Sequence, residues 1–211
     1  MSKQVTFWFD YLSPFAFFSH TRIRDIAKRE GFTLELVPYY HPKYPVAPGV
    51  IGIPPAKLSY LVEEIGRGAE RYGLPLKFPD DLDVMSNPPK APSQRPGFLA
   101  FLYAKARGRE WDANDALFKA RWLEGAHTGE PEVVADIMSR EGFDCTAVLE
   151  SIRKDEYGKE LDAIAERAER EQIFGIPIFV YKGVRFWGDD RVDQLVEAVR
   201  QGETRHVTRR A

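Results

Sequence analysis

The sequence predicts an α/β fold with one mixed β-sheet and an all-helical insertion. Two observations lead to this prediction. The first 40 residues show a strand, helix, strand pattern, and the residues after about 178 show two strands and a helix. The residues between carry only helical patterns. We therefore expect one discontinuous domain over residues 1–54 and 174–211, which completes the sheet, and an inserted helical domain over residues 55–173.

The amino-terminal β-α-β unit follows from hydrophobic patterning. Residues 5–9 are aromatic and β-branched and alternate in the manner of a strand. A helix follows, with Ser13 as its N-cap, Pro14 as its first residue and Gly31 as its C-cap. Residues 32–40 form the second strand. Two strands joined by one helix are expected to be parallel.

Helical periodicity fills the middle of the chain. Two stretches rich in proline and glycine, at about 40–55 and 75–97, are predicted to be long loops, which are usually functional in compact domains. The predicted helices of this region cover about 55–72, 98–107, 112–123, 131–140, 145–152 and 157–172.

The carboxyl-terminal part returns to β-structure. Residues 178–181 and 184–187 are separated by Lys182 and Gly183, a pattern that predicts a hairpin. A last helix is expected to begin at Asp189 or Asp190.

Composition excludes several classes of protein. There are 30 Lys and Arg residues against 32 Asp and Glu residues, a net charge of −2, which argues against nucleic-acid binding through a strong positive field. The single cysteine, Cys145, excludes an internal disulfide, a Cys-x-x-Cys pair and a multi-cysteine zinc site. The four histidines have no metal-ligand spacing, so no metal is expected. Because no signal peptide or spanning segment is visible, we expect a cytoplasmic protein without membrane contact.

Several short segments resemble a known family. They are FDYLSPF (residues 9–15), PPAKLSY (54–60), GIPIFV (175–180) and WGDDR (187–191). In their order and spacing they resemble the 2-hydroxychromene-2-carboxylate isomerases and the kappa-class glutathione transferases, a branch of the DsbA-like thioredoxin superfamily. The resemblance covers about residues 4–200.

The resemblance gives Ser13 a catalytic role. The redox members of the superfamily have a Cys-x-x-Cys at the start of this helix, where the chain reads Ser-Pro-Phe-Ala. A hydroxyl cannot exchange disulfides, but it can donate a hydrogen bond to the sulfur of bound glutathione. The positive end of the helix dipole also favours thiolate over thiol. The alternative is that Ser13 is only a good helix N-cap.

The resemblance also implies a glutathione site. A cis Ile176–Pro177 bond would expose the backbone of Ile176 to the cysteinyl main chain of glutathione, although a proline can simply begin an edge strand. Asp190 would bind the γ-glutamyl amino group, and a backbone N–H of Asp189 or Asp190 its carboxylate. Asp189 fits a plain N-cap equally well. Lys57 would bind the glycyl carboxylate, or be a solvated lysine.

One departure from the family concerns the loop before Lys57. The family commonly has an asparagine there, where this chain has Val-Ile-Gly-Ile at residues 50–53. The glycyl end of the site therefore lacks an expected amide, which a backbone N–H of the loop could replace.

An aromatic pocket is expected above the sulfur. Tyr11, Tyr44 and Trp187 are the predicted substrate-binding residues, because aromatic rings suit a planar aromatic substrate. Lys43 or Arg95 would hold a substrate carboxylate. Trp122, inside the helical block, fits either this pocket or the core.

The resemblance implies the following activity. The chain is expected to be a glutathione-dependent cis–trans isomerase of 2-hydroxychromene-2-carboxylate-type intermediates of aromatic degradation, working by thiolate addition, bond rotation and elimination. Glutathione is then a regenerated cofactor, and the family implies a homodimer. A kappa-type glutathione transferase shares every motif, and a non-catalytic thioredoxin-like binding protein is the third possibility.

Overall fold

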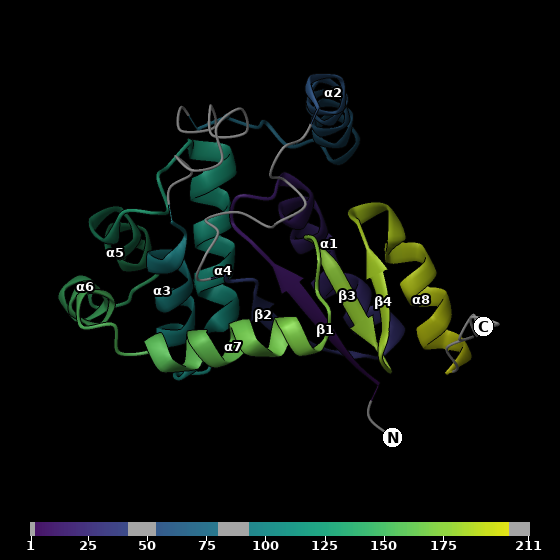
Figure 1. Cartoon of the computed structure of the whole chain (residues 1–211). Coiled ribbons are helices and arrows are strands. Elements are labelled where there is room, and N and C mark those ends of the chain that lie inside the picture. The colour runs from purple at the N-terminus through teal and green to yellow at the C-terminus, as the bar shows by residue number, and fades with distance from the viewer. Residues whose placement is uncertain (1–2, 42–53, 80–92, 203–211) are drawn as a thin grey trace.

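The expected strands combine into one mixed four-stranded sheet (Figure 1). The computed structural model describes residues 3–41, 54–79 and 93–202. The sheet has the order β2-β1-β3-β4. Its strands are β1 (Gln4–Phe9), β2 (Thr33–Pro38), β3 (Ile178–Tyr181) and β4 (Val184–Trp187). The predicted parallel β1–β2 pair and the predicted β3–β4 hairpin are both confirmed.

The sheet register brings distant segments to one end. Strand β3 is antiparallel to β1, with Ile178 opposite Trp8, and β4 is antiparallel to β3, with Trp187 opposite Ile178. The turn after β1, the segment before β3 and the segment after β4 therefore meet at the carboxyl end of β1.

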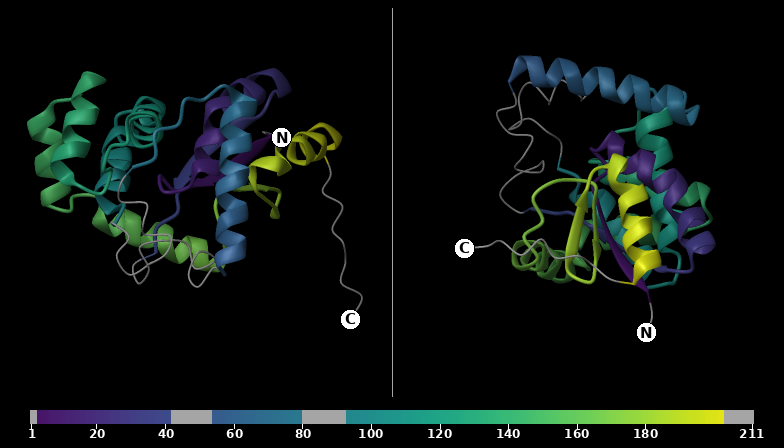
Figure 2. Two further views of the ribbon diagram at one scale, coloured as in Figure 1. Left: turned by 90° about the horizontal axis from the view of Figure 1, so that it is seen from above. Right: turned by 90° about the vertical axis from the view of Figure 1, so that its right-hand side faces the viewer.

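Helices cover both faces of the sheet (Figure 2). Helices α1 (Pro14–Glu30) and α8 (Val192–Gln201) lie on one face, and α7 (Gly158–Arg170) crosses the other. Arg167 of α7 binds the carboxylate of Glu35 at 2.6 and 3.0 Å and lies over the ring of Trp8. The central strand β1 is thus buried on both sides, with Phe7, Trp8 and Phe9 fully buried.

The remaining helices follow β2 and precede β3 in the sequence. They are α2 (Pro55–Tyr72), α3 (Arg95–Lys105), α4 (Glu110–Lys119), the π-helical segment η4 (Ala120–Glu124), α5 (Pro131–Arg140) and α6 (Cys145–Arg153). Helix α2 lies across the top of the molecule, as the right-hand view of Figure 2 shows. Among the described residues, none of the helices is long and apolar enough to cross a bilayer.

Two helix boundaries differ from the prediction. Helix α3 begins at Arg95 rather than near 98, because Pro96 is tolerated in a first turn, where its missing N–H has no partner to lose. The single helix predicted over 112–123 divides into α4 and η4.

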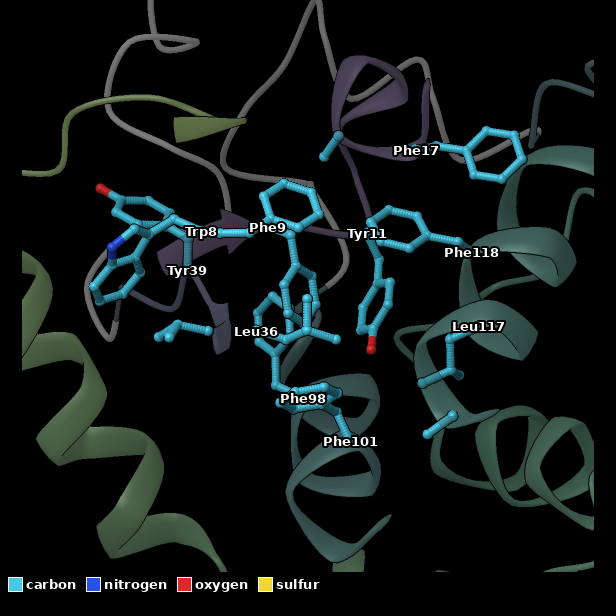
Figure 3. Close-up of a cluster of buried hydrophobic side chains, with 14 of the residues drawn as sticks. Trp8, Phe9, Tyr11, Phe17, Leu36, Tyr39, Phe98, Phe101, Leu117 and Phe118 are labelled. Atoms are coloured by element: carbon cyan, nitrogen blue, oxygen red, sulfur yellow. The ribbon is translucent and has the colours of Figure 1, made fainter. Parts of the chain in front are cut away.

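An aromatic cluster joins the sheet to the inserted helices (Figure 3). The ring of Phe9 packs against the rings of Phe101 and Tyr11, with 5.1 and 5.4 Å between the ring centroids. Tyr11 in turn packs against Phe118 of α4 at 5.0 Å and stacks on Phe98 of α3 at 5.5 Å. The turn after β1 therefore rests directly on α3 and α4. The division at residues 54 and 174 stays a prediction.

Candidate active site

The turn that links β1 to α1, residues 10–13, presents the hydroxyl of Ser13. The Ser13 N–H donates to the carbonyl of Asp10 at 3.1 Å, and the Leu12 N–H donates to the Asp10 carboxylate at 2.9 Å. The Ser13 Oγ accepts the N–H of Ala16 at 3.2 Å, which confirms the predicted N-cap. Ser13 is only partly buried. The hydroxyl is therefore fixed at the helix start, in a residue that is still partly exposed.

The returning segment reaches this hydroxyl. The Ser13 Oγ lies 3.4 Å from the carbonyl oxygen of Ile176 and donates to it. The Ile176–Pro177 bond is cis, as the resemblance implied. The carbonyl of Pro177 accepts the N–H of Gly188 at 2.9 Å, which attaches the segment after β4 to the same place. The turn after β1 thus meets the two segments that flank the β3–β4 hairpin, and together they form one site.

The segment after β4 offers an aromatic ring and a carboxylate. Trp187 is 53% exposed, and its ring meets Phe174, which is also half-exposed, at 5.2 Å. The Asp190 side chain is 70% exposed and lies 3.5 Å from Arg191. Both Trp187 and Asp190 can therefore contact a ligand.

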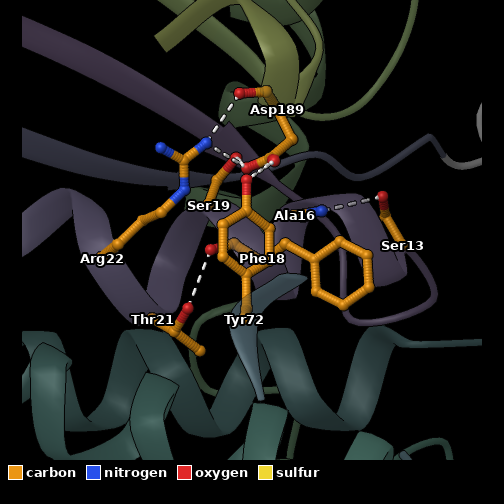
Figure 4. A network of polar contacts seen from close by, with 8 residues as sticks. All are labelled: Ser13, Ala16, Phe18, Ser19, Thr21, Arg22, Tyr72 and Asp189. Atoms are coloured by element: carbon orange, nitrogen blue, oxygen red, sulfur yellow. Dashed lines mark hydrogen bonds and ion pairs between the residues drawn. The ribbon is translucent and has the colours of Figure 1, made fainter. Parts of the chain in front are cut away.

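Asp189 has a different role from the predicted N-cap. The short 3₁₀ helix η5 (Asp189–Arg191) follows Gly188, and no side chain caps it. The Asp189 carboxylate instead accepts hydrogen bonds from Ser19 and Arg22 at 2.8 Å and from Tyr72 at 2.7 Å (Figure 4). The capping prediction is wrong because partners from α1 and α2 bind this carboxylate.

Asp10 is a buried acid beneath the Ser13 turn. Its burial raises the pKa of the carboxyl to about 7, although the Leu12 N–H and the positive charge of Arg121 act in the opposite direction. Burial of Tyr11, and after it the charge of the Asp10 carboxyl, raise the pKa of the Tyr11 hydroxyl. A proton can therefore be held or released here near neutral pH.

Comparison with known proteins identifies the fold. The family model described as a DSBA-like thioredoxin domain matches residues 4–200. The chain belongs to the DsbA-like thioredoxin family. Two curated proteins named 2-hydroxychromene-2-carboxylate isomerase, from Sphingobium xenophagum and Pseudomonas putida, are each 26% identical to this DsbA-like chain. Each match covers 92% of it, and 97% and 93% of the respective relatives.

A solved structure agrees with these relatives. The structure of a selenomethionine 2-hydroxychromene-2-carboxylate isomerase superimposes on this DsbA-like chain with a TM-score of 0.78 at 26% identity. The match covers 94% of this chain and 95% of that one. The predicted DsbA-like fold with its helical insertion is therefore confirmed.

This member of the DsbA-like family has no thiol at the helix start. The helix opens with Ser13, Pro14, Phe15 and Ala16, and the single cysteine, Cys145, is an exposed residue at the start of α6. Disulfide exchange at this site would need a cysteine, so any sulfur chemistry needs a thiol from elsewhere.

Two predicted substrate contacts are corrected. Tyr11 is fully buried among Phe9, Phe98 and Phe118 and offers no surface to a substrate, because the loop that carries it is covered by α3 and α4. Arg95 already binds the carboxylate of Asp155 at 2.7 and 3.0 Å and the Tyr40 hydroxyl at 2.9 Å, so its guanidinium is not open to a substrate carboxylate.

The other predicted residues are distributed as follows. Lys57 is exposed in the first turn of α2. Trp122 lies in the core, 1% exposed. Tyr44, Lys43 and residues 50–53 lie outside the described residues. No group of three His, Cys, Asp or Glu side chains that could hold a metal occurs within 3–41, 54–79 and 93–202.

Sequence reasoning missed two side chains of this region, Asp10 and Tyr72, and left Trp122 between the pocket and the core. All three bind a segment that forms the site. A carboxylate directly after a buried strand was the available signal for Asp10. The contacts of Trp122 and Tyr72 join residues more than 100 positions apart, and no local pattern predicts them.

Proposed function

We propose that the chain is an isomerase of 2-hydroxychromene-2-carboxylate or a closely related aromatic compound. The names of the two curated relatives and of the solved structure support this activity over more than nine-tenths of the chain. The observation that carries the proposal is the hydroxyl of the partly exposed Ser13, at a helix start and 3.4 Å from the carbonyl oxygen of Ile176, beside the cis Pro177.

The proposed cofactor is glutathione, and the residues present fit it. The exposed carboxylate of Asp190 suits its amino group, and the exposed ammonium of Lys57 suits a terminal carboxylate. The backbone of Ile176 and Pro177 suits its cysteinyl main chain. The Asp189 side chain is occupied by Ser19, Arg22 and Tyr72, so only its backbone N–H is left for a ligand.

When bound, glutathione would supply a thiolate that adds reversibly to a conjugated carbon, so that the former double bond can rotate. The chain's own residues prepare this chemistry. The Ser13 hydroxyl would exchange its 3.4 Å hydrogen bond to the Ile176 carbonyl for one to the sulfur, and the N-terminus of α1 would stabilise the negative charge of that sulfur. Each lowering of the thiol pKa by one unit corresponds to about 1.4 kcal/mol. Trp187 presents an exposed aromatic surface to a planar substrate.

The test is an isomerisation assay with and without glutathione. Wild type is expected to convert 2-hydroxychromene-2-carboxylate only when glutathione is present, and Ser13→Ala is expected to lose at least tenfold in kcat/KM. Ser139→Ala is the control, because its hydroxyl bonds only within α5, to the Asp136 carbonyl. Full activity of Ser13→Ala would contradict the proposed role.

Product analysis separates the two catalytic alternatives. An isomerase returns all the glutathione, whereas a kappa-type transferase accumulates a conjugate. If calorimetry at millimolar glutathione gives no heat, the non-catalytic binding protein is the better description.

The cytoplasmic location and the homodimer remain part of this proposal. Light scattering on the purified chain tests the homodimer: a mass near 24 kDa would exclude it, and twice that mass is expected.

A further inference from the structure

The π-helical segment η4 (Ala120–Glu124) interrupts the end of α4. Such segments are rare, and they occur often at functional sites because they rotate and displace the residues that follow. The Ala126 N–H donates to the Ala120 carbonyl at 2.9 Å and closes the wide turn. The Trp122 carbonyl accepts the N–H of Lys77 at 2.8 Å, from the segment that follows α2.

This geometry directs the indole of Trp122 at the Ser13 turn. Its side chain is 1% exposed, and its Nε1–H donates to the carbonyl oxygen of Tyr11 at 2.9 Å. Tyr11 is in the middle of the turn. The N–H groups of Leu12 and Ser13 bond locally, to Asp10, and the Ser13 hydroxyl bonds to Ile176 of the returning segment. The bond from Trp122 therefore ties the turn to the inserted helices.

We infer that Trp122 is a positioning residue for the reaction, acting through the Tyr11 carbonyl on the Ser13 hydroxyl. This inference rests on the proposed function. Without the indole N–H, the buried Tyr11 carbonyl is left unpaired, and the hydrogen bond from the Leu12 N–H to Asp10 alone orients the Tyr11–Leu12 peptide. Leu12 and Ser13 then shift, and a hydroxyl displaced by a fraction of an ångström binds a sulfur less well.

A second buried tryptophan, Trp8, provides a control for the effect of packing alone. Trp8 is fully buried in β1, but its Nε1 has no hydrogen-bond partner in the part of the chain that the structure describes. A change of tryptophan to phenylalanine removes similar volume at both positions, but removes a hydrogen bond to the turn only at 122. Trp8→Phe is therefore the matched control for Trp122→Phe.

The experiment is a double-mutant cycle with Ser13→Ala. Trp122→Phe is expected to lower kcat/KM about tenfold, and the rise of activity with pH, which follows ionisation of the thiol, should move to higher pH. Trp8→Phe should stay within about twofold of wild type in kcat/KM. In the Ser13→Ala background, Trp122→Phe should cause no further loss. Equal losses in both backgrounds, or wild-type activity of Trp122→Phe, would overturn the inference.

The outcome is distinguishable from failure of the proposed function. A wild type that lacks isomerase activity, or a fully active Ser13→Ala, contradicts the function and not the placement of the turn. The placement has its own readout: Trp122→Phe should shift the backbone amide resonances of Leu12 and Ser13, and Trp8→Phe should not. Unchanged resonances would refute it.

A measurement on wild type covers the case in which Trp122→Phe does not fold. Hydrogen exchange of the indole protons is followed by NMR with and without glutathione. The Trp122 indole proton is expected to exchange at least threefold more slowly when glutathione is present, with no change at Trp8. An unchanged Trp122 rate would count against the inference.

Discussion

The hydroxyl of Tyr72, the last residue of α2, donates a 2.7 Å hydrogen bond to the carboxylate of Asp189, directly before Asp190. Ser19 and Arg22 of α1 hold the same carboxylate. Three elements are thereby joined next to the proposed glutathione site. Because α2 also carries Lys57, this contact fixes the end of the helix whose other end is proposed to bind the glycyl carboxylate.

We expect Tyr72→Phe to lower the free energy of unfolding by about 1–2 kcal/mol, because it removes one hydrogen bond to a largely buried carboxylate. Urea denaturation measures the change. Tyr60→Phe on the same helix is the control, since Tyr60 is 54% exposed, and should stay within about 0.5 kcal/mol of wild type. Equal effects at both positions would show that the Asp189 contact is unimportant.

The raised pKa of the Asp10 carboxyl makes the stability of the fold depend on pH. This pKa is about 7 in the folded protein against an ordinary value of 3.8, so the folded chain keeps the proton to a higher pH than the unfolded chain does. The wild type should therefore lose stability as the pH rises from about 4 to about 7, by up to about 4 kcal/mol.

Asp10→Asn keeps an acceptor for the Leu12 N–H and cannot ionise. It should gain stability relative to wild type over that pH range, as measured by urea denaturation at pH 4, 5.5 and 7.5. Asp25→Asn, on the exposed side of α1, should leave the slope unchanged. A parallel pH dependence of Asp10→Asn and wild type would contradict burial of the charge.

The Glu35–Arg167 pair should change stability with pH in the opposite direction to Asp10. The hydrogen bond from Arg167 lowers the pKa of the Glu35 carboxyl. The pair therefore contributes stability above the ordinary pKa of a glutamate, and the contribution is lost as the pH falls through the lowered value.

Arg167→Met should be less stable than wild type at pH 7, and the difference should shrink toward pH 3. Thermal unfolding across this range measures it. Arg170→Met is the control, because its ion pair with Glu166 is exposed and 3.8 Å long. A difference that stays constant with pH would remove the ion pair from the explanation.

A substitution at Gly175 tests whether the exposed ring of Trp187 contacts the substrate. A Cβ at this position would lie 2.6 Å from Nε1 of Trp187. Gly175→Ala should therefore displace the indole at a stability cost of about 1 kcal/mol or less, because a half-exposed side chain can move. The KM of the aromatic substrate should rise several-fold. Gly66→Ala, with open space around its Cβ, should leave KM unchanged.

The elements that were predictable from the sequence have local causes. The β3–β4 hairpin follows from two apolar runs around Lys182 and Gly183, which both adopt the positive φ that a tight hairpin turn requires. The start of α1 follows from Ser13 and Pro14, and its end from Gly31. Patterns of this kind need only neighbouring residues.

The errors have a common physical origin. Tyr11 was placed in a loop and therefore expected at the surface, but α3 and α4 cover that loop from far along the chain. Asp189 was expected to cap a helix, but its carboxylate accepts hydrogen bonds from Tyr72 and Arg22 instead. The π-helical segment η4 has no sequence signature, because it depends on what Trp122 and its carbonyl contact.

The central position of β1 has a consequence for synthesis. Its one edge can pair with β2 as soon as about 40 residues have left the ribosome, but its other edge pairs with β3, where Trp8 meets Ile178. Until that late strand emerges, an aromatic-rich edge stays open to any neighbouring nascent chain. Ribosomes that stall before residue 178 should therefore release aggregation-prone products, with the unpaired edge of β1 exposed.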